Sequence, residues 1–189
     1  MNKVVFGILS GISILLISCA PKQMNREQLQ NYLHDEENGV KKTINHRSGL
    51  KMEVYALRPE LIYGKTKPVN KLDSLQYFMI SFSKENREAL LQAGAMNTYS
   101  KLVENLSYNT SQFCRLIVDK KDTVQLENST FSNEFGTSPA NSLLLIFKTK
   151  LPESQYELDL DELGFNIGDT KVVFQKKDLD QFTHINLKN

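Results

Sequence analysis

Residues 75–83, Leu-Gln-Tyr-Phe-Met-Ile-Ser-Phe-Ser, decide the fold. Apolar side chains occupy both alternating sets of positions in this stretch, whereas a strand with one face in water alternates apolar and polar residues. Residues 143–147, Leu-Leu-Leu-Ile-Phe, have the same character. Both stretches have the length of strands and are short for helices. They predict two central β-strands that are covered on both faces.

Stretches on either side follow the two-residue period of β-strands. Residues 50–56 alternate apolar and polar side chains after the turn residues 47–49, which predicts a hairpin over 40–57. A second hairpin is expected where residues 113–118 and 123–126 flank four polar residues. Further strands are expected at 156–161 and, after a turn at Gly168 and Asp169, at 171–175.

About seven or eight short strands at roughly ten-residue spacing predict a mainly β domain, an immunoglobulin-like β-sandwich. Residues 84–106 interrupt the pattern with apolar residues at helical spacing. With Ser83 as an N-cap and Gly94 as a break, one or two inserted helices are expected there. An α+β domain is the alternative.

A short polar segment precedes the strands. Asn25 can cap a helix over residues 26–37, and Asn38-Gly39 is a stop signal. The apolar stripe of this helix is thin, because it consists of Leu29 and Leu33. We therefore expect a marginal helix or an extended lead-in to the domain.

The N-terminus has the pattern of an export signal. Residues 1–19 read MNKVVFGILSGISILLISC, in which Lys3 precedes a mainly apolar run from Val4 to Ile17. This run is shorter than the roughly 20 residues that a membrane-spanning helix needs, and it has the length of a signal-peptide core. A plain secretory leader or a buried helix, with Cys19 incidental, is the alternative interpretation of the run.

The leader ends in Leu16-Ile17-Ser18-Cys19, which resembles the lipobox of bacterial lipoproteins. The resemblance implies that residues 1–18 are removed and that Cys19 carries the lipid that anchors the chain to a membrane. The second mature residue is Ala20 instead of the Asp of an inner-membrane retention signal, and the first acidic residue is Glu27. These features favour the outer membrane and its periplasmic face.

The predicted domain organisation follows from the leader and the strands. We expect a signal peptide over 1–18, a lipidated tether and lead-in over 19–38, and a single globular β-rich domain over 39–189. Three segments carry a further resemblance: Asn38-Gly39-Val40, residues 54–61 and residues 172–179. In this order they look like a group of lipoproteins of Bacteroidota with no established function. The resemblance implies a place in the cell envelope and supplies no activity.

Two triplets resemble the Asp-Ser/Thr-apolar sequon for O-glycosylation of exported Bacteroidota proteins. They are Asp122-Thr123-Val124 and Asp73-Ser74-Leu75. The resemblance implies Thr123 and Ser74 as acceptors, and Thr123 lies at the tip of a predicted hairpin.

Charge and residue content argue against several classes of function. The chain has 23 Lys and Arg, of which Lys3 lies in the leader, against 22 Asp and Glu, so the exported chain would be neutral. A neutral chain without a basic cluster lacks the electrostatic features of nucleic-acid binding. The three histidines, His34, His46 and His184, lie in polar or terminal stretches and suggest neither a catalytic set nor a zinc site. The sequence indicates no cofactor.

Two further features have competing interpretations. Cys114 would have no disulfide partner once Cys19 is lipidated, and we expect a small buried side chain, with a reactive thiol as the alternative.

Glu157, Asp159 and Asp161 share one side of a predicted strand. Their oxygens could hold calcium, but no Asp-rich calcium loop is present, and a solvated strand face is the simpler interpretation.

These observations predict a non-enzymatic, membrane-anchored lipoprotein that binds another envelope protein as an accessory subunit. A glycan- or peptide-binding lipoprotein is the first alternative, with the long predicted loop 129–141 as its binding element. An envelope hydrolase whose site forms only in three dimensions is the second.

Overall fold

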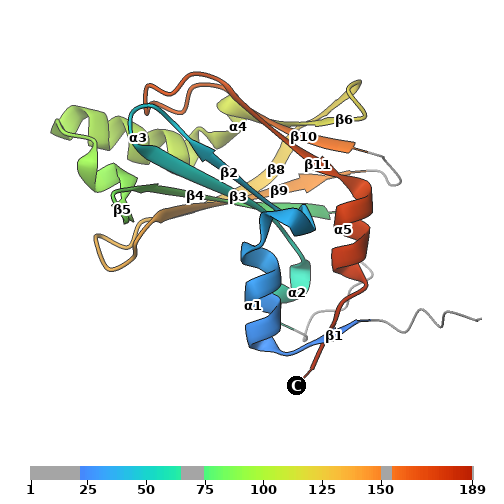
Figure 1. The fold of residues 1–189 in the computed structure, drawn as a ribbon. Coiled ribbons are helices and arrows are strands. Elements are labelled where there is room, and N and C mark those ends of the chain that lie inside the picture. The colour runs from blue at the N-terminus through green and yellow to red at the C-terminus, as the bar shows by residue number, and fades with distance from the viewer. Residues whose placement is uncertain (1–21, 65–74, 150–154, 189) are drawn as a thin grey trace, which may run out of the picture.

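Two antiparallel β-sheets that face each other form the centre of the domain (Figure 1). The computed structural model describes residues 22–64, 75–149 and 155–188. In chain order the described elements are β1 (Gln23–Met24), α1 (Arg26–His34), the 3₁₀ helix η1 (Glu36–Asn38), β2 (Lys41–Asn45), β3 (Leu50–Leu57), α2 (Pro59–Tyr63), β4 (Leu75–Lys84), β5 (Arg87–Glu88), the 3₁₀ helix η3 (Ala89–Gln92), α3 (Met96–Tyr108), α4 (Thr110–Phe113), β6 (Cys114–Val118), β7 (Asp122–Val124), β8 (Leu126–Ser132), β9 (Asn141–Lys148), β10 (Gln155–Leu160), β11 (Thr170–Gln175), α5 (Lys176–Thr183) and β12 (Asn186–Leu187).

The larger sheet has the strand order β2-β3-β4-β9-β8, with β5 paired to β4. The predicted central strands are confirmed, since β4 and β9 pair with each other and each has a second neighbour. On the inner face of β4, Phe78, Ile80 and Phe82 are fully buried. Tyr77 points to the other face and is buried as well, where Tyr63 of α2 packs edge-on against its ring. Both faces of β4 are thus covered at this point.

The smaller sheet has the strand order β11-β10-β6-β7. Phe174 of β11 contacts Phe78 of β4 with ring centroids 5.3 Å apart, so the two sheets share one core. The predicted hairpins over 40–57 and 113–126 are confirmed as β2–β3 and β6–β7. Strand β7 ends at Val124, however, and the chain passes within two residues into β8 of the larger sheet.

The strand order differs from that of an immunoglobulin domain, in which the second and third strands belong to different sheets. Here β2, β3 and β4 follow one another in a single sheet. The tight turn closed by Gly49, at φ 82°, can join only neighbouring antiparallel strands. The mainly β class is therefore confirmed, while the topology is not that of the expected sandwich.

The helix expected from residue 84 begins only at Met96. Strand β4 continues to Lys84, and a tight turn at Glu85 and Asn86, with φ 53° and 56°, leads into β5. Because Ser83 pairs with Glu88 in the ladder, it cannot act as an N-cap. The helical spacing in this region comes from η3 and α3, which are separated by Gly94.

The segment expected as a lead-in packs onto the domain. Asn25 caps α1 with a full capping box, as predicted, but α1 ends at His34 and η1 follows. Leu29 and Tyr32 of α1 are buried in the core. Strand β1 pairs in parallel with β12, so both ends of the described chain meet at one end of the molecule (Figure 1).

The loop expected over 129–141 is shorter in the structure. Residues 129–132 belong to β8, since Thr130 pairs with Leu144 and Ser132 with Ser142. Asn141 already begins β9. The connection between β8 and β9 is therefore residues 133–140, hereafter the 133–140 loop.

Candidate functional site

A buried carboxylate holds the 133–140 loop in place. Glu88 of β5 is fully buried. Its Oε1 accepts a hydrogen bond from the backbone N–H of Glu134 at 2.8 Å, and its Oε2 accepts one from Gly136 at 2.9 Å. A buried charge is tolerated only where hydrogen bonds replace its hydration, so Glu88 and the loop stabilise each other.

Two asparagines fix the ends of the same loop. The Asn133 side chain donates to Tyr99 Oη of α3 at 2.8 Å, and its Oδ1 accepts from the backbone N–H of Phe135 at 3.3 Å. The Asn141 side chain, which is fully buried, accepts from the backbone N–H of Leu90 at 3.0 Å. The loop is therefore attached to η3 and α3 as well as to its own strands.

Phe135 lies at the centre of these contacts and points into solvent. Its φ is 50°, in the left-handed region that residues with a Cβ rarely adopt, and its side chain is 77% exposed. Such a conformation costs on the order of 1–3 kcal/mol and persists only where surrounding contacts impose it. The hydrogen bonds to the N–H groups of Glu134, Phe135 and Gly136 supply that constraint. The loop thus displays an aromatic ring on a backbone that is held in place.

An apolar side chain and a hollow adjoin Phe135. Leu91 of η3 is 50% exposed, and its Cδ1 lies 3.3 Å from where a Cβ on Gly136 would be. Leu91 also lines a hollow of about 490 Å³ between η3 and the loop. The other residues that line this hollow are Asn86, Arg87, Glu88, Gly136, Thr137, Ser138 and Pro139. Exposed aromatic anchors beside a recess are typical of protein–protein hot spots.

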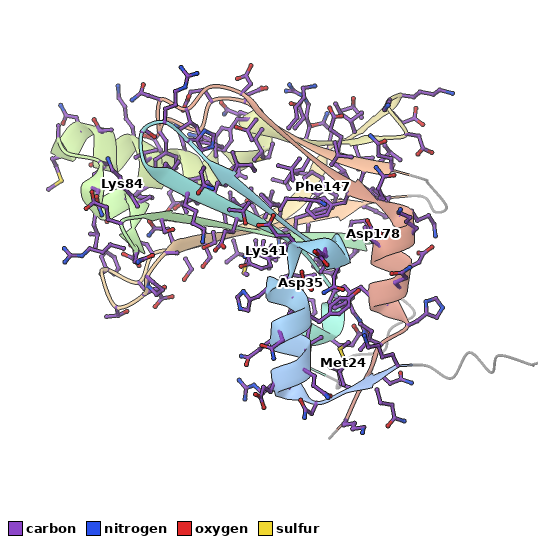
Figure 2. The ribbon with its side chains drawn as sticks, viewed as in Figure 1. Met24, Asp35, Lys41, Lys84, Phe147 and Asp178 are labelled. Atoms are coloured by element: carbon purple, nitrogen blue, oxygen red, sulfur yellow. The ribbon has the colours of Figure 1, made fainter. Side chains whose placement is uncertain are left out.

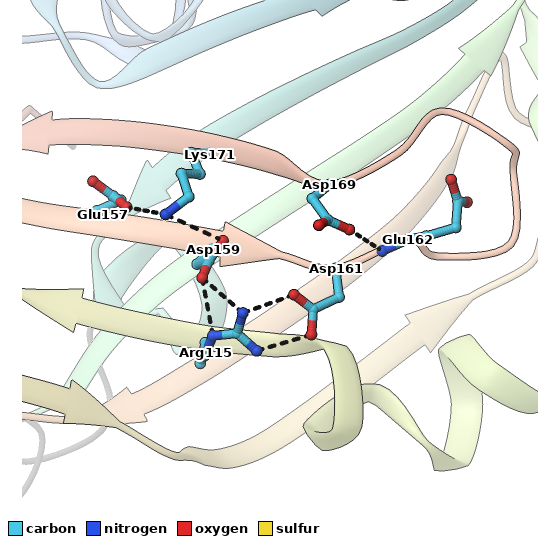
Figure 3. A network of polar contacts seen from close by, with 7 residues as sticks. All are labelled: Arg115, Glu157, Asp159, Asp161, Glu162, Asp169 and Lys171. Atoms are coloured by element: carbon cyan, nitrogen blue, oxygen red, sulfur yellow. Dashed lines mark hydrogen bonds and ion pairs between the residues drawn. The ribbon is translucent and has the colours of Figure 1, made fainter.

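The acidic residues of β10 form ion pairs with bases on the neighbouring strands (Figure 3). Arg115 of β6 donates to Asp159 at 2.9 Å and binds both oxygens of Asp161 at 2.8 and 2.7 Å. Lys171 of β11 contacts Glu157 at 3.0 Å. The register places Asp159 directly opposite both Arg115 and Lys171, so the row is a ladder of opposite charges across three strands.

These ion pairs are relevant to the alternative in which the acidic residues of β10 bind calcium. The side chain of Asp159 is only 6% exposed, and Arg115 occupies the place of a cation between Asp159 and Asp161. In the described part of the chain, no group of three or more His, Cys, Asp or Glu side chains is arranged to hold a metal. The geometry supports a structural role for the acidic residues of β10.

A second carboxylate organises the loop between β10 and β11. Glu162 accepts backbone hydrogen bonds from Gly164 at 2.7 Å, Asn166 at 3.0 Å and Gly168 at 2.5 Å. Partial burial raises the pKa of this carboxyl, but the loop N–H groups stabilise its charged form and outweigh that effect, so the pKa lies below its usual value. The Glu162 side chain thereby holds the loop closed.

The remaining candidate residues lie apart from one another. Cys114 is buried, as expected, and burial raises the pKa of its thiol to about 12, which leaves it protonated and unreactive at neutral pH. His34 packs edge-on against Tyr55, and His184 contacts the carbonyl of Asp180 at 2.6 Å. His46 lies in the turn between β2 and β3. The histidines therefore come from three separate places in the fold.

Of the predicted modification sites, Thr123 is described and is exposed on β7, the edge strand of the smaller sheet. Cys19 and Ser74 lie outside the described residues. None of the described helices is both long enough and apolar enough to cross a bilayer.

Glu88 and Phe135 were not among the residues singled out by sequence. Glu88 stands in the polar stretch Lys84-Glu-Asn-Arg-Glu88, where an exposed position is the normal expectation. Of these two residues, only Phe135 could have been noticed in the sequence, because it is a lone aromatic residue within the polar run Ser132-Asn-Glu-Phe-Gly-Thr-Ser138.

Comparisons with known proteins add no function. No protein-family model matches the chain, and no curated protein matches it. A crystal structure from Burkholderia pseudomallei, described as a novel protein of unknown function, superposes with a TM-score of 0.45 at 9% identity. The match covers 85% of this chain and 91% of the other. At this level of similarity it carries no argument about fold or activity.

Proposed function

We propose that this protein is a lipid-anchored envelope lipoprotein that binds another envelope protein through the 133–140 loop, as a non-enzymatic accessory subunit. The observation that carries the proposal is the exposed Phe135 ring, which a fully buried Glu88 holds in a strained backbone conformation. Strain that is maintained by a dedicated buried acid indicates a selected position for the ring. A loop whose backbone is already ordered also loses little conformational entropy when a partner covers it.

The proposed anchor and the loop fit together geometrically. Only three residues separate Cys19 from Gln23 at the start of β1, and the four steps along the chain can span at most about 14 Å. Lipid on Cys19 would thus keep the end that carries α1, β1 and β12 near the membrane. Figure 1 shows the connection between β8 and β9 at a different end of the molecule from β1 and the C-terminus. Phe135 would then face away from the lipid.

The same proposal places the protein on the periplasmic side of the outer membrane, with Ala20 after the lipidated cysteine. Thr123 is the better supported acceptor for O-glycosylation, because it is exposed on an edge strand. Ser74 is proposed as an acceptor from its sequon alone. In Figure 1 the β6 hairpin that leads to Thr123 lies away from the β8–β9 connection, so a glycan there would leave Phe135 accessible.

Site-specific photocross-linking in the source cells tests the proposal. A photoreactive amino acid at Thr137, which lines the hollow beside Phe135, should give one dominant cross-linked product with an envelope protein. The substitution Phe135→Asp should abolish that product, because it removes the apolar anchor. Tyr108→Asp is the matched control, since Tyr108 is an equally exposed aromatic residue, at 83%, at the end of α3.

Three outcomes contradict the proposal. The product could persist in Phe135→Asp, it could disappear equally in Tyr108→Asp, or no product could form at Thr137 in cells that contain the mature, membrane-bound protein. Each would show that the 133–140 loop is not the contact surface.

A further inference from the structure

The row of core residues on the inner face of β4 ends in a lysine. Phe78, Ile80 and Phe82 are fully buried, and Lys84 is the next residue in the same alternation. The strand register confirms that Lys84 belongs to the inner face of the sheet, because Lys84 pairs directly with Leu50, a buried core residue. Figure 2 shows Lys84 at the end of the domain away from Met24 and Asp178. Lys84, which is half-buried, thus occupies the position where the strand pattern places a core side chain.

A cleft of about 180 Å³ opens at this position, hereafter the Lys84 cleft. Its buried apolar floor consists of Leu50, Ala89 and Leu102. Phe165 forms a wall and stacks on Phe82 with ring centroids 5.3 Å apart. The remaining lining residues are Ser48, Lys84, Gln92, Ala93, Thr98, Gly164 and Asn166. The cleft is therefore built from the β2–β3 turn, β4, η3, α3 and the loop after β10.

Lys84 provides the only formal charge in this cleft, since no acidic residue is among those that line it. Within the described chain its ammonium has no hydrogen-bond or ion-pair partner, while its backbone carbonyl accepts from Gln92 Nε2 at 2.7 Å. Thr98 and Asn166 add side chains that can donate hydrogen bonds. The cleft thus combines an apolar floor with a half-buried lysine, and no acidic residue lines it.

We propose that the Lys84 cleft binds a small apolar monocarboxylate, with the carboxylate on the Lys84 ammonium and the hydrocarbon part over Leu50 and Leu102. One positive charge matches one carboxylate. The volume equals that of about six water molecules at roughly 30 Å³ each, which suits a ligand of about six to nine non-hydrogen atoms. This site is separate from the 133–140 loop and does not depend on the partner proposed there.

Calorimetric titration of the full-length chain in detergent tests the proposal with a charged and a neutral probe of equal shape. Isovalerate should bind saturably in the millimolar range, and isovaleramide should bind at least tenfold more weakly because it lacks the charge. Lys84→Met should weaken isovalerate binding at least tenfold. Lys101→Met, the same substitution at an exposed position of α3, should leave it unchanged.

A second variant tests the apolar part of the cleft while keeping the charge. Ala93→Leu adds three carbon atoms to a partly buried lining residue and should block isovalerate without shifting the thermal midpoint by more than a few degrees. Phe135→Asp should not change the titration, which separates this inference from the proposed function. Equal binding of the acid and the amide, unchanged binding in Lys84→Met, or no saturable binding would overturn it, and Lys84 would then be a lysine that extends into solvent from the edge of the core.

Discussion

Tyr32 of α1 and Phe182 of α5 stack with their ring centroids 5.7 Å apart and their planes 12° from parallel. Arg58, which precedes α2, lies over the same Phe182 ring at 5.6 Å. Its guanidinium also donates to the carbonyls of Phe182 at 3.1 Å and Ile185 at 2.6 Å, at the end of α5. Three segments distant in sequence thus meet at one aromatic ring.

Tyr32→Ala should therefore destabilise the domain by about 3 kcal/mol, as expected for removal of a buried aromatic side chain. Urea unfolding followed by circular dichroism measures this change. Hydrogen exchange should accelerate most in α1, since the stack is its main contact with α5. Gln30→Ala, at an exposed position of the same helix, is the control. Equal stability of the two variants would show that α1 is not docked in solution.

Removal of Arg115 should cost more than removal of Lys171, although both face Asp159. Arg115→Met leaves the nearly buried Asp159 carboxylate without its closest partner, and we expect a loss of about 2 kcal/mol. The Lys171 side chain is 60% exposed, so Lys171→Met should leave the free energy of unfolding nearly unchanged. Adding Asp159→Asn to Arg115→Met should recover part of the loss. Similar losses in both single variants would contradict this ranking.

Glu162 should give the domain a pH-dependent stability. Its pKa is lower in the folded chain than its ordinary value, so its contribution is present above the unfolded pKa of about 4.3 and is lost as the pH falls through the folded value. Glu162→Gln should lower the free energy of unfolding by about 1 kcal/mol at pH 7. The difference from the parent chain should shrink as the pH approaches 3.

The measurement is a set of urea unfolding curves between pH 3 and pH 7. Glu104→Gln, at an exposed position of α3, is the matched control and should show no such trend. A Glu162→Gln effect that stays constant over this range would show that the loop amides do not favour the charged carboxylate.

Cys19→Ala should release the protein from washed membranes, because it removes the site of the proposed lipid anchor. Fractionation and immunoblotting follow the distribution, and metabolic labelling with a fatty acid follows the modification. Cys114→Ala, which changes the buried cysteine, should remain in the membrane fraction and keep the label. Sedimentation of Cys19→Ala with membranes would refute the lipoprotein assignment.

The sequence predicted the structure best where the residues of a single segment determine its secondary structure. Residues 77–80 of β4 and 143–147 of β9 are apolar on both faces, and only a central position in a sheet suits such segments. The β2–β3 hairpin was predictable because its turn contains Gly49 at a positive φ. The helices expected within residues 84–106 are confirmed as η3 and α3. Their predicted start after Ser83 was wrong because pairing of Ser83 with Glu88 extends the sheet there, and pairing partners are not encoded in local spacing.

The candidate sites depend on contacts that no local pattern reveals. Glu88 becomes a buried residue only because backbone N–H groups of Glu134 and Gly136 replace its hydration, and backbone groups leave no mark in a sequence. The outward orientation of Arg115 could have been predicted more easily. It is the only charged residue of the apolar run from Phe113 to Val118, so its alternation already indicated an outward position, although the acidic strand beside it is known only from the pairing of β6 with β10.

The parallel pairing of β1 with β12 brings the two ends of the described chain together, because Gln23 lies beside Asn186 and Met24 beside Leu187. Strand β12 is the last of the described elements and completes a ladder with β1, the first of them, so this part of the fold cannot form before Leu187 has been synthesised. Joining the two ends with a short linker and opening the chain elsewhere, for example between β6 and β7, should preserve the native packing. A peptide fused to either end would occupy the same corner of the molecule.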